Sequence, residues 1–238
     1  MQFEENILPY LNFNKCRQDS WFNYLFGVKE AGVYGTISIE TGLSTLFIPK
    51  LPSEYRIWCG EIHPPSHFKD SYAVDEALYV EDLVEWMKTT LGDDENTKLH
   101  VMTGVNSDSG LTAKPARFEG DDNFWSTTNR IDTTTLFSLL SLSRVIKSPE
   151  EIEVMRYCAY VASNAHVAVM KAARSCSFEY ELEAKFLFEI YANGGCRRCA
   201  YTSICACGPN SSVLHYGHAG APNDRMLTRT DMVGNHAT

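Results

Sequence analysis

The sequence predicts an α/β fold in its first part, followed by a region in which two helices precede a group of strands. Strand-like and helix-like segments alternate up to about residue 147, as in α/β domains. Ser148-Pro149-Glu150-Glu151 then has the composition of a helix N-terminus. After the helices, residues 199–216 are rich in small, β-branched and aromatic side chains, which suit strands.

The first part of the chain begins with an expected β-hairpin. Residues 33–48 alternate in polarity on either side of Glu40-Thr41-Gly42, which predicts two antiparallel strands and a short turn. Residues 51–69 contain three prolines, and we expect them to be irregular. Residues 75–87 carry apolar side chains at helical spacing and predict a helix, and residues 99–102 predict a short strand.

Two helices are expected after the boundary near Lys147. The first begins with Ser148 as its N-cap and runs to about Arg174. Ser177 is expected to cap the second, which ends near Asn193 at a glycine pair. The apolar face predicted for the first helix is Ile152, Met155, Ala159, Ala162, His166, Val169 and Ala173. The stripe predicted for the second is Leu182, Phe186 and Ile190.

The stretch from Cys199 to Arg225 concentrates the polar and thiol side chains that suggest a site. We expect one strand over residues 199–207, a turn at Gly208-Pro209-Asn210, and a second strand over residues 213–216. Side chains alternate along a strand, so the first strand would point one set of residues to a common face. That set is Tyr201, Ser203, Cys205 and Cys207.

Composition excludes several classes of function. Apolar residues are 44% of the 238-residue chain, which is enough for a folded core. The net charge is −9 and the basic residues are scattered, so we expect no nucleic-acid partner. No apolar run is long enough to cross a membrane, and the N-terminus has no signal-peptide pattern. We therefore expect a cytoplasmic protein whose eight cysteines are reduced thiols.

Two metal sites are possible on residue types alone. Cys196, Cys199, Cys205 and Cys207 could form a four-thiolate zinc site, but their spacing is not that of a zinc ribbon, which favours unligated thiols. His215 and His218 could form a metal pair. They stand three positions apart with a glycine between them, so we do not expect a helix to present both on one face. A structural or surface histidine pair is the more frequent outcome.

The chain resembles the prolidase family, the Xaa-Pro dipeptidases, and within it the eukaryotic members. The similarity is collinear from about Arg17 to Met232. The segments that carry it are Phe26–Val28, Thr41–Pro49, Gly104–Gly110, Lys147–Arg156, Tyr201–Cys205 and Asn210–Asp224.

The resemblance implies two domains and a metallopeptidase activity. Residues 1–146 would form a creatinase-type α/β domain, and residues 147–238 would form the first part of an α+β "pita-bread" domain. The family hydrolyses dipeptides that end in proline or hydroxyproline, using two manganese ions and a bridging hydroxide. The resemblance also implies a homodimer.

Three side chains are expected in the site by the same resemblance. His215 matches the family's catalytic histidine, which contacts substrate and stabilises the tetrahedral intermediate without binding metal. Tyr201 matches a tyrosine near the metal centre, and we assign it to substrate binding. Trp58 matches a substrate-side residue that reaches a partner subunit's site, with a half-buried loop aromatic as the alternative.

The metal ligands of the family do not match this sequence. They are two aspartates, a histidine and two glutamates, all expected after Met232, and His236 stands where the first aspartate should be. We therefore expect no metal ligands in this chain, an inactive 238-residue polypeptide, and a truncated product. The alternative is a non-catalytic chain that forms dimers with full-length prolidase subunits.

Overall fold

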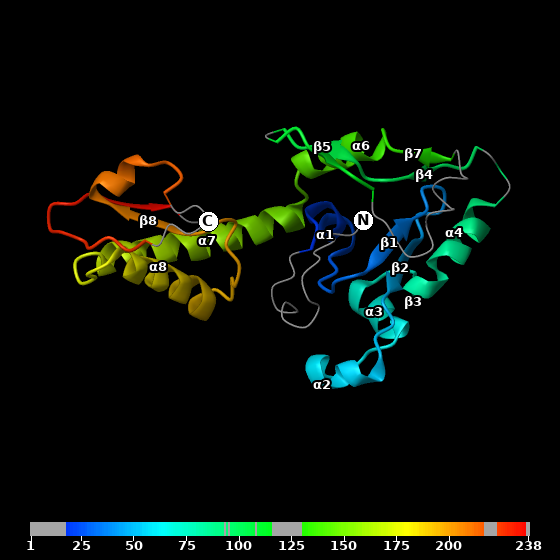
Figure 1. Cartoon of the computed structure of the whole chain (residues 1–238), viewed down its shortest axis with the longest axis horizontal. Helices are drawn as coiled ribbons and strands as arrows, with labels where there is room; N and C mark the ends of the chain where they lie inside the picture. Colours follow the sequence, from blue (N-terminus) through cyan, green and yellow to red (C-terminus); the bar gives the residue numbers. More distant parts are fainter. Residues whose placement is uncertain are drawn as a thin grey trace. The chain divides into compact units, whose positions relative to one another are not determined.

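The computed structural model describes residues 18–92, 94, 96–107, 109–115, 130–216 and 223–236. The chain divides into two compact units, Met1–Val145 and Ile146–Thr238, which we call unit 1 and unit 2. Figure 1 labels most of their helices and strands. No helix in the described ranges is both long enough and apolar enough to cross a membrane.

A three-stranded sheet lies at the centre of unit 1. Strands β1 (Tyr34–Ile37) and β2 (Ser44–Ile48) are antiparallel, with Tyr34 opposite Phe47, so the predicted hairpin is confirmed. Strand β3 (Glu76–Tyr79) runs parallel to β2. The helix predicted over residues 75–87 is therefore wrong in its first part, because pairing with β2 outweighs the local helical pattern.

The other elements of unit 1 are short. The segment 51–69, expected to be irregular, instead contains one 3-10 turn, the whole of one short helix and the first part of another. The strand predicted at residues 99–102 is present in its first half. The remaining elements are α1 (Ser20–Phe26), η1 (Ser53–Tyr55), α2 (Arg56–Cys59), α3 (Pro65–Tyr72), η2 (Val80–Asp82), α4 (Leu83–Leu91), β4 (Leu99–His100), β5 (Gly104–Val105), β6 (Thr112–Ala113), β7 (Ile131–Asp132) and α6 (Leu136–Val145).

Strand β2 separates two apolar clusters in unit 1. Successive side chains of a strand point to opposite faces, and β2 is buried on both. Leu46 and Ile48 pack with Phe22, Val28, Val33 and Val74. Phe47 packs with Tyr34, Leu83, Met87 and Leu91.

Unit 2 begins with a long, well-capped helix. Helix α7 (Pro149–Ala172) starts after Ser148, whose hydroxyl accepts from Glu151 N at 3.2 Å. The Glu151 carboxylate accepts from Ser148 N at 2.8 Å, which completes a capping box. The predicted helix start is confirmed. Helix α8 (Glu179–Phe188) and the π turn η3 (Glu189–Asn193) follow.

The second helix starts two residues later than its predicted cap. Phe178 is the N-cap of α8 and makes no side-chain cap bond. The backbone N–H of Ser177 instead donates to the Glu181 carboxylate at 2.9 Å. The capping role predicted for Ser177 is therefore wrong.

The core of unit 2 packs α7 against α8. The predicted stripe of α8 is confirmed, since Leu182, Phe186 and Ile190 are buried. On α7 the prediction is confirmed in the second half of the helix, where Val169 is buried and Ala162, His166 and Ala173 are half-buried, but it missed the buried Val161 and Ala165. In the first half the prediction is wrong, since Ile152, Met155 and Ala159 are exposed.

Candidate functional site

The site stretch contains one short strand rather than two. Strand β8 covers only Ile204–Cys207, and it pairs antiparallel with β9 (Val233–His236). The segment predicted as a second strand follows the 3-10 helix η4 (Gly208–Ser212) and forms a turn at residues 214–216. Gly208, the first residue of η4, has a φ of 54°, which glycine adopts readily because it has no Cβ.

The thiols of β8 are buried. Ser203, Cys205 and Cys207 are buried, whereas Tyr201 lies before the strand and is exposed, so the predicted common face holds only in part. Burial raises the pKa of Cys205 to about 12 and that of Cys207 to about 11. Both thiols are therefore protonated near neutral pH and are poor nucleophiles.

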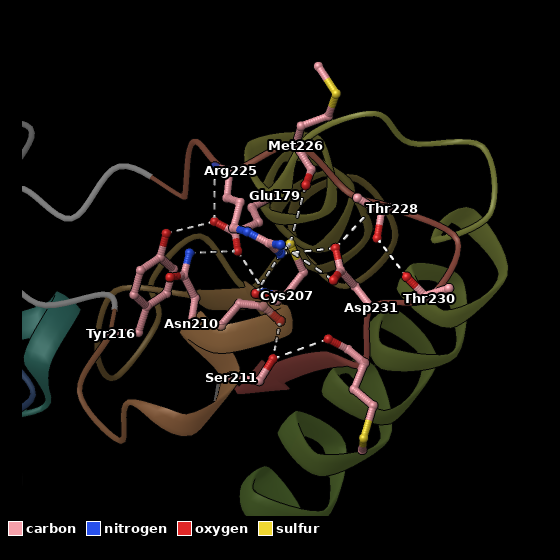
Figure 2. A network of polar contacts seen from close by, with 12 residues as sticks. Glu179, Cys207, Asn210, Ser211, Tyr216, Arg225, Met226, Thr228, Thr230 and Asp231 are labelled. Atoms are coloured by element: carbon pink, nitrogen blue, oxygen red, sulfur yellow. Dashed lines mark hydrogen bonds and ion pairs between the residues drawn. The ribbon is translucent and has the colours of Figure 1, made fainter.

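A buried carboxylate, that of Glu179, organises the polar residues around β8 (Figure 2). Glu179 Oε1 accepts from Cys207 N at 2.6 Å and from Asn210 Nδ2 at 3.2 Å. Its Oε2 accepts from Tyr216 Oη at 2.7 Å and from Arg225 N at 3.2 Å. Burial by itself raises the pKa of Glu179, but these donors outweigh it and hold the pKa below the ordinary value. The carboxylate is therefore charged.

Arg225 links the end of β8 to the segment before β9. Its Nη1 donates to Cys207 O, to Cys207 Sγ and to Asp231 Oδ2, each at 2.9 Å. Asp231 Oδ2 also accepts from Thr228 N at 2.9 Å. The hydrogen bond from Arg225 lowers the pKa of Asp231. This ion pair therefore holds both segments together, as Figure 2 shows.

Asn223 provides a second buried connection to α8. Its Nδ2 donates to Glu183 Oε2 at 2.8 Å and to Ser203 O at 3.0 Å, and its Oδ1 accepts from Cys205 N at 3.3 Å. Its φ of 45° lies in the left-handed region, which asparagine tolerates better than most residues. Asn223 therefore fixes the start of the segment that leads to β9.

The predicted site residues lie in three places. His215 is exposed in the turn after η4, and Tyr201 is exposed in a bend before β8. Trp58 belongs to α2 in unit 1, where 68% of its surface is exposed. His218 lies outside the described residues. The roles of His215, Tyr201 and Trp58 stay predictions.

The described side chains do not fit a pair of metal ions. Within the described ranges, no three histidine, cysteine, aspartate or glutamate side chains are grouped so as to hold a metal. Glu179, Glu183 and Asp231, three acidic groups around β8, already accept bonds from protein donors. We therefore derive no catalytic step through a metal from these residues.

Glu179, Asn223 and Arg225 were missed at the sequence level. Glu179 could have been found, because it continues the spacing of Leu182 and Phe186 and so lies on the buried face of α8. The partners of Asn223 and Arg225 come from distant parts of the chain. Local sequence carries no signal for them.

Two family models match the chain. The aminopeptidase P N-terminal domain matches residues 6–100, and metallopeptidase family M24 matches residues 153–235. The human Xaa-Pro dipeptidase is 44% identical over 216 residues, which are 91% of this chain and 42% of that protein. The chain thus spans less than half the length of this relative.

Solved aminopeptidase P structures have a similar fold. The Pseudomonas aeruginosa aminopeptidase PepP matches with a TM-score of 0.72 and 26% identity, covering 93% of this chain and 49% of that one. Zn-substituted Escherichia coli aminopeptidase P in complex with product matches with a TM-score of 0.69 and 22% identity, covering 100% of this chain and 52% of that one. The second likeness concerns the fold alone.

Proposed function

Because this chain belongs to metallopeptidase family M24 and is of the prolidase type, we propose that the protein hydrolyses dipeptides with a C-terminal proline or hydroxyproline. The observation that carries the proposal is the 44% identity to the human Xaa-Pro dipeptidase, which extends over 91% of the chain. Isolated motifs do not give a match of this length.

The Xaa-Pro bond requires a specialised peptidase. Its nitrogen has no hydrogen to donate, and the proline ring fixes the local backbone. A site for it therefore has to recognise the ring and the free carboxylate of the dipeptide. We assign substrate contacts to Tyr201 and His215, and to Trp58 through its aromatic surface.

His215 is the side chain that we assign to catalysis. An imidazole next to the scissile carbonyl can donate a hydrogen bond to the oxygen on which negative charge develops. Its exposure in the turn after η4 supports this role, because a dipeptide can reach it.

We propose, as the resemblance to the prolidase family implies, that none of the family's metal ligands is among residues 1–238. The family is a metallopeptidase family, so a divalent metal is implied, and hard oxygen ligands would favour manganese. The acidic groups around β8 are engaged with protein donors. A polypeptide of residues 1–238 should therefore bind no manganese stoichiometrically.

The proposal extends to the two domains of the protein, its oligomeric state and its cellular location. We propose that residues 1–146 are the creatinase-type domain and residues 147–238 part of the peptidase domain. We propose a cytoplasmic homodimer, which accords with the free thiols among the described cysteines. Ile57 and Trp58, exposed on α2, support a subunit contact.

A binding experiment on residues 1–238 tests substrate recognition. Gly-Pro should shift the amide signals around Tyr201 and His215 in an NMR titration, and Pro-Gly should not. Equal responses to the two dipeptides would refute the assignment. Hydrolysis of Gly-Pro by this polypeptide with stoichiometric manganese, measured by elemental analysis, would refute the assignment of the metal to other residues.

An exposed apolar helix favours a second candidate function. Ile57 and Trp58 would let the chain act as a non-catalytic partner of longer prolidase subunits. Native mass spectrometry of a mixture of the two should then show heterodimers. Separate species at micromolar concentrations would exclude this function.

A further inference from the structure

Glu179 binds both segments that lead to and from the turn of His215. Cys207 N, Asn210 Nδ2 and Tyr216 Oη belong to the segment that runs from β8 into this turn. Arg225 N belongs to the segment that returns toward β9. A single carboxylate at the start of α8 thus joins two segments that are distant from it in the chain (Figure 2).

His215 lies between two side chains that donate to this carboxylate. Asn210, in η4, lies five residues before His215, and Tyr216 follows His215 directly. The backbone between them is also bonded locally, since Val213 N donates to Asn210 O at 3.0 Å and Tyr216 N donates to Val213 O at 3.2 Å. The segment that carries His215 is therefore bonded to Glu179 on both sides of this residue.

We propose that Glu179 is the positioning residue for His215 and acts through Asn210 and Tyr216. The inference rests on the proposed function in one respect, namely that His215 contacts substrate. A buried carboxylate with four donors holds one geometry, whereas exposed turns with local bonds alone sample several. A catalytic imidazole gains from such support, because small displacements reduce the rate.

The charge of Glu179 supports this role. Its donors keep the carboxylate ionised despite burial, so each bond to it is charge-assisted and stronger than a neutral one. The alternative is that Glu179 only stabilises the fold of unit 2. The two roles differ in what the loss of the Tyr216 hydroxyl does, because that change leaves Cys207, Asn210 and Arg225 bonded.

The experiment uses the 238-residue polypeptide with four substitutions. Tyr216→Phe removes one hydroxyl from the network, and Tyr160→Phe makes the same change at an exposed position of α7. Glu179→Gln removes the charge and one acceptor oxygen, and Glu183→Gln does the same at the carboxylate that binds Asn223. The readouts are the His215 ring signals, amide hydrogen exchange by NMR, thermal unfolding, and the response of His215 to Gly-Pro.

Positioning predicts a specific pattern. Tyr216→Phe should change the His215 ring signals, raise amide exchange at residues 213–216 by about tenfold, and weaken the response to Gly-Pro, with the midpoint of unfolding within a few degrees of wild type. Glu179→Gln should add faster exchange at Cys207 N, which donates to the carboxylate. Tyr160→Phe and Glu183→Gln should leave the His215 signals unchanged.

The outcomes separate this inference from the proposed function. If Tyr216→Phe leaves the His215 signals and the exchange at residues 213–216 as they are in Tyr160→Phe, the positioning role is refuted, even if Glu179→Gln fails to fold. If those signals change but Gly-Pro never perturbs His215 in the wild type, positioning stands and substrate contact by His215 fails.

Discussion

The two units stabilise their strands by different means. In unit 1 the sheet is held by apolar side chains on both faces of β2, with Leu46 and Phe47 fully buried on opposite sides. In unit 2 strand β8 is buried too, but the segments around it are held by a charged carboxylate and an ion pair. An apolar cluster accepts substitution by another apolar side chain of similar volume. The polar network instead requires a hydrogen-bond donor at each of its positions.

Phe47→Ala should have the largest effect and tests the apolar side of this comparison. Phe47 is fully buried and packs edge-on against Trp86, with ring centroids 5.3 Å apart. Its truncation should lower the free energy of unfolding of unit 1 by about 4 kcal/mol. Urea unfolding followed by tryptophan fluorescence measures this, because all four tryptophans precede residue 146. A loss below about 1 kcal/mol would contradict the packing described.

Glu179→Ala tests the polar side and should have the next largest effect. Four donors would lose their acceptor, and we expect unit 2 to lose about 3 kcal/mol of stability. Amide exchange of α7, α8 and β8 measures this loss. Glu153→Ala is the matched control, since its side chain is 77% exposed and its Oε1 lies 3.8 Å from Arg156 Nε. Equal losses in the two variants would refute the importance of the network.

Acidification should weaken unit 2 through the same carboxylates. The pKa values of Glu179 and Asp231 are lowered in the folded state. Their contribution is therefore fully present above the ordinary carboxyl pKa values and is lost as the pH falls through the folded values. Amide exchange of unit 2 measures this loss of stability between pH 6 and pH 3, which is about the range in which carboxyl groups titrate. Glu179→Gln should flatten the dependence, and an unchanged slope would contradict the assignment.

Ser148→Ala should have the smallest effect of the four. The capping box supplies two hydrogen bonds at the start of α7, and its loss should cost about 1 kcal/mol. The matched control is Ser163→Ala in the middle of α7, where the hydroxyl bonds only to Ala159 O. That control should be neutral or slightly stabilising. Fraying of residues 149–152 in amide exchange distinguishes the two variants.

Local patterns predicted the elements whose causes are local. The hairpin of β1 and β2, the capping box at Ser148 and the α8 stripe of Leu182 and Phe186 depend on neighbouring residues. Strand β3 was missed because its pairing with β2 involves residues 31 positions away, such as Thr45 and Glu76.

The candidate site was less predictable for the same reason. The resemblance to prolidases supplied His215, Tyr201 and Trp58, which no periodicity distinguishes from other exposed residues. The bond from Arg225 N to Glu179 joins residues 46 positions apart, and only the fold brings them together. The partner strand of β8 was likewise predicted at Val213–Tyr216, which is adjacent in sequence. Helix η4 separates these residues from β8, and the strand that pairs with β8 is β9.

The burial of the β8 thiols affects where the protein is chemically modified over time. Cys205 and Cys207 carry raised pKa values and have no exposed surface, so peroxide and alkylating reagents should react with them slowly. Cys59 and Cys158 are exposed. Among the described cysteines, chemical damage in storage should therefore collect first at those two surface thiols, while the thiols of β8 stay intact.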